Sequence, residues 1–396
     1  MSVKQRITSA SEALFPEIQR VRRHLHQHPE LSFEEFETAD YIENYIHQLG
    51  LTTTRMAGTG VICLLKGKNP SKSTLALRAD IDALPISEKN TCEYRSQKEG
   101  VMHACGHDVH TASLLGALTI LKDLKDEFEG TIKFIFQPGE ERIPGGASLL
   151  IAEGVLKNPE VHQIIGQHVM PLLPAGHVGF RKGMYMASAD EIYITIKGKG
   201  GHGAHPHSLI DPVTIGAQVI TALQQVVSRN AKPATPSVLS IGKVIAHGAT
   251  NIIPDEMYLE GTFRTFDETW RYKAHEQIKK TVVGICEAMG AKVDIDIKVG
   301  YPYLENHPDF TETIQGYAKE FLGESKVHDL EIWPAGEDFA FYTREIPGTF
   351  YRLGIRNEEL GIISNLHTNT FDIDENALKT GMGLLAYATF RELSRQ

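Results

Sequence analysis

The segment from Met102 to Thr111 holds the densest set of side chains that could carry out chemistry. Its ten residues include three histidines, one cysteine and one aspartate, and the apolar run that follows, Ala112 to Leu121, predicts a helix. Cys105 and His107 lie two positions apart, so in an extended or turn segment both side chains can point the same way. A thiolate and an imidazole that converge just before a helix indicate half of a divalent-metal site. The alternative is a polar loop with a buried cysteine and surface histidines.

Other candidate side chains follow predicted strands and one later turn. Open α/β sheets bind their ligands at the carboxyl ends of the strands, so side chains in such places are expected to meet. A pair of neighbouring glutamates is unusual there, because like charges repel each other unless cations offset them. The candidates in these places are Asp82, Glu140, Glu141, His168 and His367.

The number of potential metal ligands indicates two ions rather than one. The set consists of Cys105, His107, Glu141, His168 and His367. Five protein ligands exceed what a single tetrahedral zinc uses, and they suit two divalent ions that share a water or a carboxylate. Glu140 then remains as a general base, which takes a proton from the metal-activated water and passes it to a leaving amine. The alternative is a solvated Glu-Glu turn.

The elements that must position these side chains have the pattern of an α/β protein. Residues 4–49 are predicted to be helical with an interruption at Pro29, and the second helix runs from about Phe33 to Leu49. The histidines near Pro29 are interpreted as capping or surface groups. Helices and strands alternate again after Tyr303. The strands predicted before that point cover 60–66, 73–78, 130–136 and 164–168.

A different pattern begins near Met186 and predicts a second, smaller domain. Its order is β-α-β-β-α-β, as in a ferredoxin-like unit. The predicted elements are strands over 191–197, 238–244, 257–264 and 293–299 and helices over 211–227 and 268–289. We therefore expect a discontinuous metal-binding domain formed by residues 1–185 and 303–396, with residues 186–302 inserted as a small domain of its own.

Several motifs taken together resemble those of the metallo-aminoacylase and carboxypeptidase superfamily. They are ACGHDVHT, FQPGEE, GQHV, GEDF and LHTNTFD. Within the superfamily the chain is similar to the amidohydrolase branch of hippurate hydrolases, auxin-conjugate hydrolases and N-acetyl-diaminopimelate deacetylases. The resemblance implies a metallopeptidase-like catalytic domain with a central mixed sheet flanked by helices. It also implies that the inserted residues 186–302 are a lid and dimerisation domain. It also implies hydrolysis of the amide bond of N-acyl amino acids or related conjugates, with the five ligands and the base Glu140 named above.

The sequence departs from the wider superfamily at one ligand. The usual His-x-Asp before a proline is Asp80-Ile81-Asp82 here, with Pro85 at the matching distance. The first histidine ligand is therefore absent, and the resemblance to this branch implies that Cys105 replaces it. Asp82 would keep its role of orienting a ligand or the shared water. Mixed Cys, His and Glu ligation suits Zn²⁺ or Mn²⁺, and Co²⁺ or Ni²⁺ also fit.

The smaller domain carries three residues that the resemblance assigns to substrate binding. His202, in a Gly-rich turn, would reach a neighbouring active site and so implies a homodimer or a higher homo-oligomer. Asn251 and Arg264 would bind the carboxylate or carbonyl group of the substrate. Arginine suits bidentate recognition of a carboxylate, which favours an N-acyl amino acid as substrate. The alternative for Arg264 is a surface charge at the end of a strand.

Composition limits the remaining possibilities. The 396 residues are 41% hydrophobic and 23% charged, as in a globular protein of about two domains. A net charge of −10 argues against nucleic acid or an anionic membrane as the main partner. The sequence shows no apolar run of membrane-spanning length and no signal-peptide core, and its four dispersed cysteines fit a reducing cytoplasm.

Two other functions compete with a hydrolase. Gly198 to Gly203 satisfies GxGxxG after a predicted strand, but dinucleotide binding requires a helix to begin at once, and here it begins only near Asp211. The second competitor is a non-catalytic binding or scaffold protein with a structural metal. Such a site is coordinatively closed and has no spare acid, so Glu140 and the excess of ligands argue against it.

Overall fold

The computed structural model describes residues 1–395, which form two compact units. The first unit comprises residues 1–185, 305–332 and those from 338 onward. The second comprises Met186–Leu304 together with the short segment Trp333–Glu337. The backbone of Ala187 donates to the carbonyl groups of Trp333 and Ala335, which ties this segment to the second unit. No helix among the described residues is long and apolar enough to cross a membrane.

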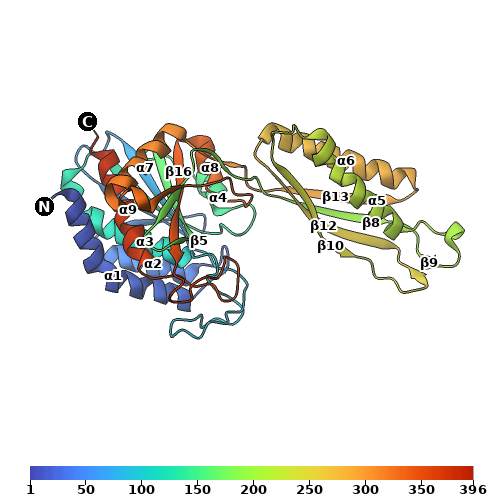
Figure 1. The fold of residues 1–396 in the computed structure, drawn as a ribbon, viewed down its shortest axis with the longest axis horizontal. Coiled ribbons are helices and arrows are strands. Elements are labelled where there is room, and N and C mark those ends of the chain that lie inside the picture. The colour runs from blue at the N-terminus through green and yellow to red at the C-terminus, as the bar shows by residue number, and fades with distance from the viewer. Residues whose placement is uncertain (396) are drawn as a thin grey trace. The chain divides into compact units, whose positions relative to one another are not determined.

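A mixed eight-stranded sheet is the centre of the first unit (Figure 1). Its central strands, from β4 to β16, pair in parallel, whereas β2 pairs antiparallel with both β1 and β4, and β6 runs antiparallel to β16. The predicted central sheet is therefore confirmed. In spatial order its strands are β1 (Thr53–Met56), β2 (Gly60–Lys66), β4 (Thr131–Gln137), β3 (Thr74–Asp80), β5 (Gln163–Pro174), β16 (Gly348–Arg356), β6 (Val178–Phe180) and β15 (Val327–Asp329).

The inner strands β3 and β4 are buried along their whole length, although each contains polar residues. Central strands of a sheet with both faces covered have this uniform burial, so burial does not alternate along them as it does in a half-buried strand. The strand β16 lies between β5 and β6, although about 180 residues separate it from both in the chain.

Helices pack around this sheet and bury one large apolar cluster. α1, α3 and α9 contact one another, while α4 and α8 contact each other and the strands β4 and β16 respectively. The helices of the unit are α1 (Val3–Gln27), α2 (Phe36–Gln48), α3 (His107–Asp123), α4 (Gly146–Ala152), α7 (Pro308–Leu322), α8 (Ala340–Glu345) and α9 (Ala377–Leu393). β7 (Gly183–Met186) and β14 (Leu304–Asn306) lie where the chain passes between the units.

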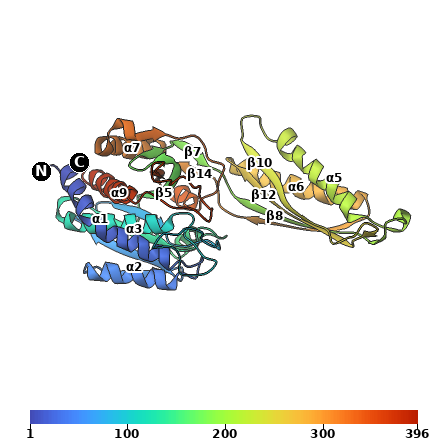
Figure 2. The same cartoon turned by 60° about the horizontal axis from the view of Figure 1, so that its bottom comes forward.

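The second unit has the predicted β-α-β-β-α-β order (Figure 2). Its antiparallel sheet has the order β10-β12-β8-β13, and α5 and α6 cover one face. The other face is polar, so β8 alternates between buried isoleucines and more exposed residues. The elements are β8 (Asp190–Lys197), β9 (Gly201–His202), α5 (Pro212–Gln225), β10 (Ser237–Ile245), β11 (Ile252–Ile253), β12 (Glu256–Thr265), α6 (Glu268–Ala288) and β13 (Lys292–Val299).

Two local expectations were wrong. The helix α3 begins at His107, five residues before the apolar run from which it was predicted, because Gly106 occupies the N-cap position and polar residues form the first turn. The histidines at the end of α1 are also not all capping or surface groups. His26 is fully buried, with Nδ1 2.8 Å from Asp108 Oδ2, and Arg22 donates to the same oxygen.

Candidate metal centre and active site

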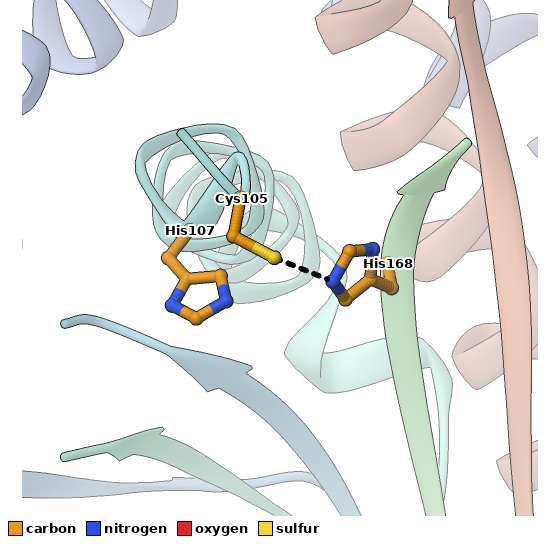
Figure 3. Close-up of side chains that lie close together, drawn as sticks. All are labelled: Cys105, His107 and His168. Carbon is orange, nitrogen blue, oxygen red and sulfur yellow. Dashed lines mark hydrogen bonds between the residues drawn. The ribbon is translucent and has the colours of Figure 1, made fainter. Parts of the chain in front are cut away.

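The start of α3 determines where Cys105 and His107 point. Gly106 has φ +83°, a left-handed conformation that glycine adopts without strain. A Cβ at this position would lie 2.6 Å from Val169 Cγ2, so a side chain would also collide with β5. This sharp turn brings Cys105 and His107 to the carboxyl end of the sheet, next to His168 of β5 (Figure 3).

The five predicted ligands lie together. Cys105 Sγ is 3.4 Å from His168 Nε2 and 3.3 Å from His367 Nε2. Glu141 Oε1 is 3.2 Å from His367 Nε2 and 3.9 Å from His107 Nε2. His367 reaches the site from a turn in which its own φ is +59°, and its N–H donates to the carbonyl of Ala104. Segments that are far apart in sequence therefore converge on one point.

The chemistry of these side chains fits divalent metal ions. Ligand atoms of Cys105, His107 and His168 lie within 4.8 Å of one another, and so do those of Cys105, Glu141 and His367. His107 Nε2 is buried and has no hydrogen-bond partner among the described residues. A buried polar atom without a partner is costly, and coordination of a cation would satisfy this nitrogen.

Asp82 orients His107 and the neighbouring turn. Its Oδ1 is 3.1 Å from His107 Nδ1, which directs Nε2 of the same ring toward the other ligands. Its Oδ2 accepts hydrogen bonds from the Ser32 hydroxyl (2.6 Å) and from the backbone N–H of Glu141 (3.0 Å). One buried carboxylate thus fixes two of the predicted ligands at once.

The electrostatics of the site indicate excess negative charge. Burial lowers the pKa of His107, but Asp80 and Asp82 more than offset this effect and raise it to about 10. Burial, together with Glu141 and Glu140, raises the pKa of the Cys105 thiol well above its usual value. The same carboxylates that retain these protons would attract divalent cations, and metal binding would release the protons.

Glu140 lies beside the ligands on the turn that follows β4. Its carboxylate is buried and lies within 4.8 Å of ligand atoms of His107 and Glu141. The preceding Gly139 has φ +58°, which allows the chain to turn sharply after Pro138. The glutamate pair is therefore not a solvated surface turn, since Glu140 is only 6% exposed.

A buried network that the sequence reasoning did not assign supports the centre. Asp80 Oδ1 is 2.5 Å from His110 Nδ1, and Asp80 Oδ2 accepts a hydrogen bond from Arg78. His110 Nε2 accepts the backbone N–H of Val169, and Arg78 also donates to Asp338. Two sequence signals point to this network: Asp80 ends the fully buried strand β3, and His110 follows His107 by three residues on one helix, which places both on the same side.

The three predicted substrate-binding residues lie in the second unit. His202 and Asn251 are exposed neighbours, because β9 pairs with β11 and the N–H of Gly203 donates to the carbonyl of Asn251. Arg264 lies near the C-terminal end of β12, away from that hairpin. Burial lowers the pKa of Arg264. The hairpin offers no dinucleotide site, because α5 begins only at Pro212.

Comparison with known proteins identifies the family. Residues 76–390 match Peptidase family M20/M25/M40. The chain belongs to this family. YhaA of Bacillus subtilis strain 168 is 41% identical over 395 residues, which are 99% of each chain. The N-acyl-L-amino acid amidohydrolase of Geobacillus stearothermophilus is 45% identical over 289 residues, 73% of this chain and 77% of the other.

A solved structure from the same family extends the comparison to three dimensions. The Bacillus subtilis YXEP protein, described as a dinuclear metal binding peptidase from the M20 family, superposes with a TM-score of 0.81. It is 35% identical and the match covers 96% of this chain and 99% of that one. The family resemblance inferred from the motifs is therefore confirmed, and the chain is a hydrolase of a family that includes dinuclear metal enzymes.

Proposed function

We propose that this protein is a metal-dependent amidohydrolase that cleaves the amide bond of N-acyl amino acids or related conjugates. The observation that carries the proposal is the convergence of five ligand side chains on one point, where Cys105, His107 and His168 are buried and His367 is exposed, with the carboxylate of Glu140 beside them. The similarity to an N-acyl-L-amino acid amidohydrolase supports this choice of substrate.

Cys105, His107, Glu141, His168 and His367 would hold two divalent ions, Zn²⁺ or Mn²⁺, with Co²⁺ or Ni²⁺ as further possibilities. When bound, the ions supply Lewis-acid polarisation of the acyl carbonyl and lower the pKa of a nearby water. Asp82 keeps His107 oriented through Nδ1, so that its Nε2 faces the metal site.

Glu140 would act as the general base. One of its carboxylate oxygens takes a proton from the attacking water while the water oxygen bonds to the acyl carbon. The same proton then passes to the amide nitrogen as the C–N bond breaks, and the products are a carboxylic acid and an amine. Its position supports this role, because a general base must lie within reach of the water that the metal site would hold.

The proposal is tested by a hydrolysis screen of acetyl-, benzoyl- and longer-acyl amino acids, with each of the four metals added to metal-free protein. We expect turnover of at least one class and loss of that turnover on chelation. Glu140→Gln should keep both metals and substrate affinity while kcat falls by roughly two to four orders of magnitude, the usual worth of a positioned base. Glu141→Gln is the matched control and should instead weaken metal binding. If the two variants behaved in the opposite way, their roles would be exchanged.

The same experiment separates an enzyme from a non-catalytic scaffold with a structural metal. A scaffold would hold one tightly bound ion per chain and would show no turnover in the screen. We expect about two ions per chain in the fully loaded protein. The excess of ligands over the four that a closed structural site uses supports the enzyme.

Substrate binding is proposed to involve a second copy of the chain. His202 would act in trans and donate a hydrogen bond to the oxyanion that forms on the acyl carbon, while Asn251 and Arg264 bind the substrate carboxylate or carbonyl. The exposure of His202 on a Gly-flanked hairpin supports this, because such a turn can approach a partner closely. We also propose that this homodimer works in the cytoplasm, where its four unpaired cysteines would stay reduced.

Mixing two inactive variants tests the action in trans. A dimer of one Glu140→Gln chain and one His202→Ala chain contains one site with both defects and one with neither. Up to half of the wild-type activity per mixed dimer should therefore return. Confirmed subunit exchange without any recovery would show that His202 does not act across an interface.

A further inference from the structure

The turn that carries Glu140 is held by hydrogen bonds on both sides of this residue. On one side, the backbone N–H of Glu141 donates to Asp82 Oδ2 over 3.0 Å. On the other side, the backbone N–H of Gly139 donates to Glu35 Oε1 over 2.8 Å. The peptide unit after the proposed base, and the Pro138–Gly139 peptide one residue before it, are thus each fixed by a buried carboxylate from a distant part of the chain.

Glu35 lies at a position where a side chain would normally cap a helix, yet the Glu35 side chain binds elsewhere. It is the N-cap residue of α2, but it makes no side-chain capping hydrogen bond. Its Oε1 instead accepts the N–H of Phe33 as well as that of Gly139, and its Oε2 accepts the hydroxyl of Thr59 over 2.5 Å. Both oxygens are occupied by donors, so the carboxylate is not a candidate metal ligand.

The carboxylate that caps α2 belongs to a different residue. Glu30 accepts the backbone N–H groups of Glu37 (3.3 Å) and Thr38 (2.8 Å) in the first turn of the helix. Glu30 is buried, as Glu35 is, and lies in the same segment of the chain. One buried acid therefore stabilises the helix, and the other stabilises the turn after β4.

Phe33 adds a second contact between this segment and the turn. Its φ is +68°, an unusual and costly conformation for an aromatic residue. Its ring covers Gly139 so closely that a Cβ at Gly139 would lie 2.3 Å from Phe33 Cε1. Strain of this kind persists where surrounding contacts enforce it, and here the contacts are with Glu35 and with the residue before Glu140.

We infer that Glu35 is a positioning residue for Glu140: it fixes the Gly139 peptide so that the proposed base is presented to the reacting water. This inference rests on the proposed function, in which Glu140 is the base. Glu35 touches neither substrate nor ligand; it acts through the backbone. A displacement of about 1 Å at a reacting group can cost about 100-fold in rate, and loss of a supporting hydrogen bond in a metal site costs about 10–100-fold.

The test compares Glu35→Ala, Glu35→Gln and the matched control Glu30→Ala in metal-loaded protein, with the best substrate from the screen. In Glu35→Ala we expect kcat to fall about 10–100-fold, with KM within about twofold and metal content unchanged. Glu35→Gln should keep kcat within about threefold, because its amide oxygen still accepts from Gly139 while its amide nitrogen can donate to the Thr59 oxygen. Glu30→Ala should lower the melting temperature through loss of a helix cap but leave kcat within about twofold.

Three outcomes would overturn the inference. The first is an unchanged kcat in Glu35→Ala. The second is a loss in Glu35→Gln as large as in Glu35→Ala, which would indicate that the charge and not the hydrogen bond matters. The third is an equal loss of kcat in Glu30→Ala, which would indicate general destabilisation.

A crystal structure of Glu35→Ala separates this inference from the proposed function. If the wild type hydrolyses nothing in the screen, the proposed function fails. Glu35 is then judged by structure alone, since a shift of the turn at Glu140 supports the positioning role and an unmoved turn overturns it. If the wild type is active and Glu35→Ala is equally active, only the inference about Glu35 fails.

Discussion

Each unit of the molecule contains a cluster of buried charged side chains, and the two clusters differ in how completely they are satisfied. In the second unit, Asp190 accepts hydrogen bonds from Arg271, His275 and the backbone of Gly300. Arg271 also donates to Glu268, so the charged groups of this cluster have partners of opposite charge. In the first unit, the ligand atoms face one another, and His107 Nε2 lacks a hydrogen bond to any described residue.

The comparison shows how a structural cluster differs from a metal site. Buried charges that hold a fold in place are neutralised by protein partners, as around Asp190. Buried ligands that converge without such partners need cations from solution. Burial and charge alone do not distinguish a structural cluster from a metal site. Buried ligand atoms that lack hydrogen bonds and point at a common centre do distinguish them.

The largest effect is expected when a ligand is removed from the first cluster. Cys105→Ala or His107→Ala should lower metal occupancy and reduce kcat by more than the 10–100-fold typical of a supporting partner. Elemental analysis and steady-state kinetics measure both quantities. Cys286→Ala is the matched control, because this thiol is also buried but lies in the second unit. Full metal occupancy in both ligand variants would refute the ligand assignment.

The second cluster should respond in stability and not in metal content. Asp190→Ala leaves the Arg271 guanidinium buried without its main partner, so we expect a loss of about 3–5 kcal/mol in the free energy of unfolding. Denaturant titration measures it. Asp296→Ala, at an exposed position of β13, should change stability by less than about 0.5 kcal/mol. A change in metal content in Asp190→Ala would contradict the assigned difference between the clusters.

A smaller effect is expected at the carboxylate that supports the metal ligands. Asp82→Asn keeps the shape of the side chain but weakens its hold on His107 Nδ1, so metal affinity should fall about 10–100-fold. Competition with a chelator measures the affinity. Ser32→Ala removes one neutral donor from Asp82 and should have a weaker effect. Equal affinities of wild type and Asp82→Asn would show that the ring needs no such support.

The smallest effect is a pH dependence of the second cluster. Burial raises the pKa of Asp190, but hydrogen bonds from His275 and Arg271 more than offset this and lower it below the usual 3.8. Asp190 therefore stabilises the folded state at a pH above its pKa in the unfolded chain. This stabilisation is lost as the pH falls through the pKa of Asp190 in the folded state. The difference in unfolding free energy between wild type and Asp190→Asn should shrink below about pH 4 in metal-free protein. If this difference in unfolding free energy grew as the pH fell, it would contradict a lowered pKa of Asp190.

Local sequence patterns predicted the helices and strands better than the long-range hydrogen bonds that hold the site in place. The strand predicted over 60–66 coincides with β2, because its apolar run is bounded by a glycine and a charged residue. By contrast, β5 continues beyond His168 to Pro174, through residues that pair with β16 and are partly exposed. The contacts of Glu35 with Gly139 and of Asp80 with His110 join residues that are distant in sequence, and no local pattern indicates such pairs.

The predicted ligands and base could be named because residue types with metal affinity are rare at strand ends and because the motifs resemble a known family. The structure brings all five ligands together, while their roles stay predictions until metal is measured. The buried state of His26 was missed because the helix end that carries it is polar in sequence. Its partners come from α3 and from the loop that contains Glu88.

The place of β16 in the sheet has a consequence for biosynthesis. This strand is made after the whole second unit has been synthesised, yet it fills the gap between β5 and β6. Until residue 356 has left the ribosome, the strands β5 and β6 each have an unpaired edge, and such edges promote aggregation. Pairings across about 180 residues also form slowly, because a long loop must be closed first. The nascent first unit is therefore expected to depend on chaperones, whereas the second unit can complete its own sheet earlier.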